Sequence, residues 1–298
     1  MSGLPSPIGS ALVTDLPGPV HHDDDSAPHR QRRIGQRPAV RRSLIGLAAF
    51  VGAGFLLLPV VVIFVEALRL GLGPYFEAIS ESATRHAIWL TVLTAIVVVP
   101  VNIGFGICAA WAITRFTFKG KKLLITLIEI PFSISPIVAG VAYLFLYGSQ
   151  GLLGPLLAAY EVQVMFTVPA IFLVSLFVTS PFVARELIAT MQVQGNDYEE
   201  AALSLGASGW KTFLLVTLPG MKWGLLYGAL LCNARVMGEF GAVSVVSGSI
   251  RGQTNTLPLQ IELLFNDFSS VGAFAAATIL TLLALLSLAG KIWLERQR

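Results

Sequence analysis

Arg235 and Glu239 are the residues of this sequence whose chemistry most needs an explanation, because both stand inside a long apolar stretch. Their spacing places the two side chains on one face of a helix, where they can form an ion pair. A charged side chain at the centre of a bilayer costs at least ~2.5 kcal/mol on insertion scales, so it needs a partner or water. The pair indicates a structural ion pair or packing against a second membrane subunit, and less often a direct contact with an anion.

A second polar group lies in the stretch IEIPFSISPIVAG, where Pro131 and Pro136 frame Ser133 and Ser135. Prolines free backbone carbonyls and bend a helix, and hydroxyl groups can bond either to those carbonyls or to a passing oxyanion. Local repair of the helix is the more common role for such serines.

Groups for catalysis or cofactor binding do not stand out in the sequence. It contains no G-x-x-x-x-G-K-[ST] segment that would cradle phosphates, and beyond residue 42 the only histidine is His86. The run HHDDD at residues 21–25 indicates a solvated tail more than a metal site, and Cys108 and Cys232 fall in apolar stretches, where packing is the expected role. We therefore expect no enzyme activity and no bound cofactor on this chain.

The composition indicates which elements must position these side chains. Of the 298 residues, 55% are hydrophobic and only 12% are charged, with a mean hydropathy of +0.75. Soluble domains carry about 25% charged residues, so the bilayer is the expected solvent. The net charge of +3 comes from basic residues scattered between apolar runs, a pattern that argues against nucleic-acid binding.

Six stretches reach the ~20 apolar residues that a helix needs to cross a hydrocarbon core. They are Leu44–Val65, Ala87–Ile113, Leu123–Tyr147, Met165–Ala184, Leu225–Val246 and Val271–Gly290. The sequence therefore predicts an all-α integral membrane protein with six transmembrane helices and both ends on one side.

The basic residues predict which side that is. Most of them lie before the first span, after the second and fourth spans, and at the C-terminus, whereas Arg69, Arg85 and Arg251 belong to the opposite side. By the positive-inside rule, both termini are cytoplasmic in a multi-pass protein of the plasma (inner) membrane. The sequence predicts that residues 1–42 form a disordered basic cytosolic tail and that residues 43–298 form a single membrane domain.

The segment NDYEEAALSLGASGWKTFLLVTLP, residues 196–219, interrupts this apolar pattern on the cytoplasmic side. Asp197 is placed to cap a helix over residues 198–205, with Glu200 as the capping-box carboxylate. Gly206 can end that helix in the left-handed conformation. Ser208 can cap a second helix over residues 209–216, which we expect to stop before Pro219. A structured excursion of this length favours a docking role over a plain connection.

This segment resembles the EAA signature of binding-protein-dependent ABC importer permeases. The matching residues are Glu200, Ala201, Ala202, Gly206, Val216, Leu218 and Pro219, with valine where isoleucine is commoner. The resemblance implies that the loop at residues 185–222 forms coupling helices in a cleft of a cytosolic ATPase dimer, which binds ATP and Mg. It implies an ATPase-coupling role for Asp197, Glu200, Ala201, Ala202, Gly206 and Ser208. It also implies the type I importer fold, with five core helices and the first span outside them.

The later sequence resembles permeases for a particular class of substrate. Gly238–Gly241, which reads GEFG, is similar to permeases for tetrahedral oxyanions in general, molybdate included. The continuation from Ala242 to Leu259 resembles the W-type permease of sulfate/thiosulfate importers, and the likeness covers most of residues 85–290. It implies a T-type permease partner and an extracytoplasmic sulfate-binding protein. Ser247 and Arg251 would then contact sulfate weakly or touch that protein, although an ordinary solvated loop explains them nearly as well.

Two other functions remain as alternatives. One is a molybdate or tungstate ABC permease, which the stretch after Gly241 disfavours. The other is an ion-coupled secondary transporter, which would need intramembrane carboxylates for ion coupling. Glu239 is the one such carboxylate that supports an ion-coupled secondary transporter, and its expected pairing with Arg235 weakens that support.

Overall fold

The computed structural model describes residues 38–296 of the chain, and every regular element among them is helical. The elements are α1 (Pro38–Ala67), α2 (Leu72–Ser80), α3 (Ser82–Arg115), α4 (Lys121–Ser133), α5 (Pro136–Tyr147), α6 (Gly154–Ala159), α7 (Val168–Gln194), α8 (Asp197–Ser204), α9 (Gly209–Thr212), the π-helix η1 (Phe213–Thr217), α10 (Leu218–Gly220), α11 (Lys222–Met237), α12 (Gly241–Ser247), α13 (Leu257–Asn266) and α14 (Ser270–Glu295). The predicted all-α class is confirmed.

The chain divides into two units, residues 1–55 and 56–298. In the first unit the described part is the N-terminal half of α1, which begins at Pro38, so residues 38–42 of the predicted tail are helical. The rest of that tail, with the HHDDD run, lies outside the described residues. The second unit holds the C-terminal part of α1 and the remaining helices.

The number of predicted membrane spans agrees with the described helices. Four of these are long and apolar enough to cross a membrane, and two bent helix pairs raise the number to six if each pair is one span. The bent pairs are α4 with α5, and the segment Gly209–Gly220 with α11.

The third predicted span, Leu123–Tyr147, is wrong as a continuous helix. Its two halves, α4 and α5, meet at an angle of 109°. Ser135 between them has φ −58° and ψ 136°, outside the helical region, because a residue that precedes proline is pushed toward extended backbone. Pro136 then occupies the first turn of α5, where its missing N–H costs nothing.

The fifth predicted span, Leu225–Val246, also breaks. Helix α11 ends at Met237, and a separate short helix, α12, begins at Gly241. Gly241 lies against the bend of the third span, since a Cβ added there would stand 3.2 Å from Pro136 Cβ. The two helix breaks are therefore neighbours.

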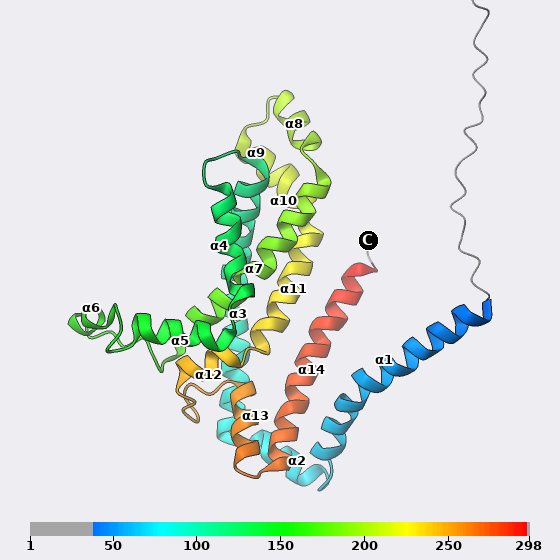
Figure 1. Ribbon diagram of the computed structural model, residues 1–298, viewed down its shortest axis with the longest axis vertical. Helices are drawn as coiled ribbons and strands as arrows, with labels where there is room; N and C mark the ends of the chain where they lie inside the picture. Colours follow the sequence, from blue (N-terminus) through cyan, green and yellow to red (C-terminus); the bar gives the residue numbers. More distant parts are fainter. Residues whose placement is uncertain (1–37, 297–298) are drawn as a thin grey trace, which may run out of the picture. The chain divides into compact units, whose positions relative to one another are not determined.

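Helix α7 forms the centre of the second unit. It packs against α3 and α11, and α4 and α12 contact it as well (Figure 1). Inside this group the Asn102 side chain donates to Thr179 Oγ1 at 2.7 Å and lies 3.5 Å from Cys232 Sγ. This contact ties α3, α7 and α11 together and gives buried Cys232 the packing role that the sequence predicts.

Two glycines let α11 approach α7 closely. A Cβ at Gly224 would lie 2.4 Å from Thr190 Oγ1, and one at Gly228 would lie 3.2 Å from Val183 Cα. The sequence pattern Gly-x-x-x-Gly is typical of such contacts between membrane helices.

We expect Gly228→Leu to destabilise the helix pair by about 1–3 kcal/mol, since the added side chain meets backbone of α7 that cannot move by changing rotamer. The measurement is thermal unfolding of the purified protein in detergent. Gly104→Leu on α3 is the matched control, because outside its chain neighbours and the backbone of its own helix no described atom lies within 4 Å of a Cβ at that position. Equal losses in the two variants would contradict the close contact.

Candidate functional site

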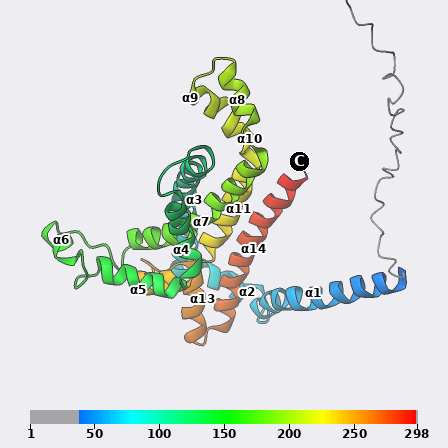
Figure 2. The same ribbon diagram turned by 45° about the horizontal axis from the view of Figure 1, so that its top comes forward.

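The segment between α7 and α11, residues 195–221, is called the elbow below. It contains α8, α9, η1 and α10 and lies at one end of the helix group, with α12 and α13 toward the other end (Figures 1 and 2). The residues of the EAA-like pattern all lie on it.

The predicted turn of the elbow is present. Gly206 has φ +87°, in the left-handed region that favours glycine, and the amide of Ala207 donates to Ala202 O at 3.0 Å. Ser208 caps α9, accepting from the amide of Lys211 at 3.4 Å. Both structural predictions are confirmed.

The predicted cap of the first elbow helix is wrong. Asn196, not Asp197, is the N-cap of α8, and the described residues show no side-chain cap bond there. Glu200 is exposed and does not form a capping box. The reason is that the neighbouring Glu199, half-buried, turns toward the helix group and fixes the rotation of α8 through tertiary bonds.

The second elbow helix does not stop before Pro219. After α9 the chain widens into the π-helix η1, where the amide of Leu218 donates to Phe213 O, and it continues through Pro219 to Gly220. A 65° bend then separates it from α11. Proline removes one amide donor and crowds the carbonyl four residues earlier, and the wider π turn lies where that crowding occurs. Such turns occur frequently at functional sites.

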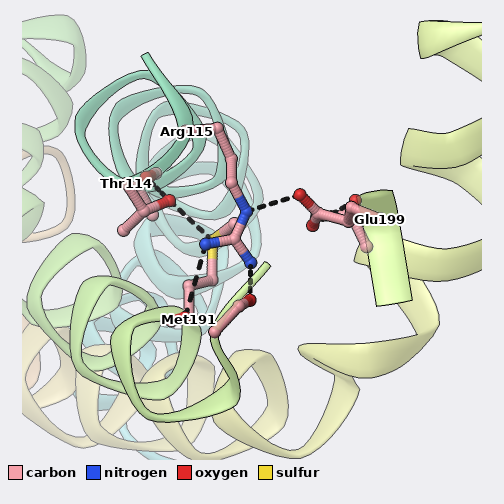
Figure 3. Close-up of polar contacts among 7 residues, drawn as sticks. Thr114, Arg115, Met191 and Glu199 are labelled. Carbon is pink, nitrogen blue, oxygen red and sulfur yellow. Dashed lines mark hydrogen bonds and ion pairs between the residues drawn. The ribbon is translucent and has the colours of Figure 1, made fainter. Parts of the chain in front are cut away.

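Arg115, the last residue of α3, fastens the elbow to the membrane helices (Figure 3). Its Nε donates to Glu199 Oε2 at 2.6 Å, its Nη2 to Gly195 O at 3.0 Å and its Nη1 to Met191 O at 3.4 Å. The other Glu199 oxygen, Oε1, accepts from Thr217 Oγ1 at 2.7 Å. This network is called the Arg115 clamp. It joins the ends of α3 and α7 to α8 and η1.

The Arg115 clamp is largely shielded from solvent. The Arg115 side chain is 10% exposed and that of Glu199 is 14% exposed. Phe213 adds an apolar anchor beside it, with its ring 4.8 Å from that of Trp111 between centroids. Sequence reasoning missed Glu199 because the signature directs attention to Glu200. The signal was the adjacent glutamate pair, together with an arginine at the end of the second span on the same predicted side.

The outer face of α8 carries apolar side chains. Tyr198 is 78% exposed and Leu205 is 89% exposed, and Ala201 lies exposed between them at helical spacing. Trp210 on α9 is also exposed. Large exposed side chains gathered on a projecting segment are typical of a surface that binds another protein.

The predicted pair Arg235–Glu239 is confirmed, with 2.7 Å between Arg235 Nη1 and Glu239 Oε2. Glu239 follows the end of α11, and its Oε1 accepts from the amide of Ala242, in the first turn of α12, at 3.1 Å. Only 1% of the Glu239 side chain is exposed, against 33% for Arg235. Arg235 therefore presents a cation at the surface of this chain, beside the two helix breaks.

The other predicted polar residues do not join one site. Ser133 and Ser135 are exposed at the bend between α4 and α5. Ser247 is fully buried and accepts from the amide of Ser249 at 3.1 Å, so its hydroxyl is closed to an anion in this structure. Arg251 forms an exposed ion pair with Asp267. Within residues 38–296 no group of His, Cys, Asp or Glu side chains could hold a metal ion.

Comparison with known proteins gives the family. Residues 102–296 match the family described as "Binding-protein-dependent transport system inner membrane component". The chain belongs to this family. It is therefore a multi-pass permease component of the inner membrane, as the apolar helices also indicate.

Relatives with similar sequences include two sulfate transport proteins. The sulfate transport system permease protein CysW of Escherichia coli strain K12 is 54% identical over 252 residues, which cover 85% of this chain and 87% of that protein. The CysW protein of Synechocystis is 46% identical over 258 residues, 87% of this chain and 94% of that protein.

A solved structure supports the fold of the family. One chain of a bacterial alginate ABC transporter, crystallised with an alginate-bound periplasmic protein, superposes with a TM-score of 0.72. The alignment covers 87% of this chain and 93% of that chain at 15% identity, so it bears on the fold alone. The type I importer transmembrane fold that the sequence resemblance implies is confirmed.

Proposed function

We propose that this permease is the W-type subunit of a sulfate/thiosulfate importer and forms half of the path through the membrane. The observation that carries the coupling role is the elbow, where the family signature coincides with an exposed apolar face on a projecting helix. The substrate rests on the sulfate transport relatives and on the sequence between Gly238 and Leu259. The same relatives disfavour a molybdate permease and a secondary transporter.

The elbow is the proposed docking surface for a cytosolic ATPase dimer. Both termini and the elbow are then cytoplasmic, in agreement with the distribution of basic residues. Tyr198, Ala201 and Leu205 supply the apolar contact, and Asp197 and Glu200 border it. ATP and Mg belong to the ATPase, while this chain does no catalysis and binds no cofactor.

The remaining partners follow from the two-permease architecture that the family resemblance implies. A T-type permease completes the path, and an extracytoplasmic sulfate-binding protein supplies the anion. Arg235, with its partly exposed side chain, and the exposed Ser133 and Ser135 are the proposed residues of the path or of the permease interface. In this arrangement the separate binding protein recognises sulfate tightly. The path then needs no strongly positive site, which would bind a divalent anion too firmly to release it.

The test is uptake of labelled sulfate by proteoliposomes that contain the complete complex, with the binding protein outside and ATP inside. We expect sulfate uptake that unlabelled thiosulfate inhibits and molybdate does not, because the binding protein and the path select the oxyanion together. A complex without this chain is the control. If molybdate inhibits the uptake and thiosulfate does not, the sulfate assignment is wrong. Uptake in the absence of ATP would contradict an ATP-driven importer.

A further inference from the structure

Helix α8 depends on polar bonds for its position. Among the described residues of the second unit it contacts chiefly α9 and η1, and none of its own residues is buried. Apolar packing therefore does little to hold it, although it is the helix proposed to receive the motion of the ATPase. The bonds of Glu199 are its recorded side-chain ties to the rest of the chain.

Glu199 has two arms, one that ends on the membrane helix α3 and one that ends on η1, the part of the elbow that leads into α11. Through Oε2 it bonds to Arg115 at the end of α3, and through Oε1 to Thr217 in η1, which continues by α10 into α11. Both distances, 2.6 and 2.7 Å, are those of short charge-assisted hydrogen bonds. A displacement of α8 must move both ends or break one of the bonds.

Arg115 makes the first arm stiff. Its planar guanidinium also donates to Met191 O and Gly195 O, at the C-terminal end of α7. Backbone carbonyls at a helix end lack intrahelical partners and carry partial negative charge, so three acceptors fix the cation. A lysine, with a single flexible ammonium, would not reproduce this fork.

We propose that Glu199 is the positioning residue through which α8 moves the membrane helices, with α3 driven through Arg115 and α11 through Thr217. This inference rests on the proposed function, in which α8 receives the motion of the ATPase. It assigns the transmission of that motion to a largely shielded carboxylate that does not face the ATPase, whereas the exposed face of α8 serves for docking.

The test uses the complete complex in proteoliposomes and compares Glu199→Gln and Arg115→Lys with the parent protein. Three quantities are measured for each: the amount of ATPase that copurifies, the rate of ATP hydrolysis, and sulfate uptake per ATP. We expect unchanged copurification and hydrolysis within about twofold, with uptake per ATP reduced about tenfold or more, because a largely shielded charge pair loses one partner or its geometry.

Two further variants make the result specific. Thr217→Val keeps the volume of a side chain that is 5% exposed and removes only the second arm, so it should fold and lower uptake per ATP less than Glu199→Gln does. Glu66→Gln breaks an exposed ion pair with Arg69 and should leave all three quantities unchanged.

The outcomes separate this inference from the proposed function. Normal uptake per ATP in Glu199→Gln, or uptake and hydrolysis that fall in proportion, overturns the transmission role. If Glu199→Gln does not accumulate, Thr217→Val decides: a normal uptake-to-hydrolysis ratio there overturns the proposal. Leu205→Asp tests docking alone, and if it leaves copurification of the ATPase intact, the proposed function fails at its docking step instead.

Discussion

Gly206→Val is expected to lower sulfate uptake by about tenfold or more, because valine at φ +87° costs at least ~1–2 kcal/mol in the left-handed region and is worse for its branched Cβ. Helix α8 has no buried side chain among its described residues with which to offset that strain. The turn between α8 and α9 should therefore open, and the docking face should lose its alignment with Trp210. The measurement is uptake together with copurification of the ATPase.

Two controls separate the turn from general strain. Gly206→Asn should retain most of the uptake, since asparagine tolerates left-handed backbone. Gly71→Val introduces similar strain at φ +94°, again with no described atom within 4 Å of the added Cβ, but far along the chain from the elbow. Full uptake in Gly206→Val, or equal loss in Gly71→Val, would contradict a specific role for this turn.

Arg235→Ala should destabilise the protein by about 3 kcal/mol, because Glu239 is 1% exposed and loses the cation that compensates its charge. The amide of Ala242 would remain as its one recorded partner. We expect a lower unfolding temperature in detergent and less assembled complex. The exposed pair gives the comparison: Arg69→Ala, whose ion pair spans 3.5 Å at the surface, should cost under about 1 kcal/mol.

A second substitution distinguishes structure from transport. Glu239→Gln keeps an oxygen for the amide of Ala242 and removes the charge, so the double variant Arg235→Leu with Glu239→Gln should recover most of the lost stability. If Arg235 also faces the anion path, uptake stays low in this stable double variant. Recovery of both stability and uptake would confine the pair to a structural role, and normal stability in Arg235→Ala would refute the ion-pair argument itself.

The sequence predicts well what depends on local patterns. Six apolar stretches match the membrane helices in number, and the cap at Ser208, the left-handed Gly206 and the ion pair at Arg235 need only near neighbours in the chain. Each of these follows from helix periodicity or from the backbone preference of a single residue. Family resemblance added the importer fold, which the superposition confirms.

Directions and tertiary bonds were harder to predict. An apolar run indicates burial in lipid but not whether a helix ends within it. The prolines of the third span predicted a bent helix but not a complete break of 109° at Ser135, and the end of α11 at Met237 was missed. The cap of α8 was misplaced because Glu199 is held by Arg115, which lies 84 positions earlier in the chain. Local capping rules do not include such a partner.

Because none of the residues of α8 is buried, this helix can change its sequence more freely than the membrane helices can. Because the described helix contributes no side chain to the apolar interior, its outer surface is free to change without disturbing the lipid-embedded helices. What a replacement must keep is a carboxylate at the position of Glu199 and a glycine at the position of Gly206. We therefore expect that chimeras in which the rest of this helix is exchanged between importers bind a different ATPase and keep their own substrate.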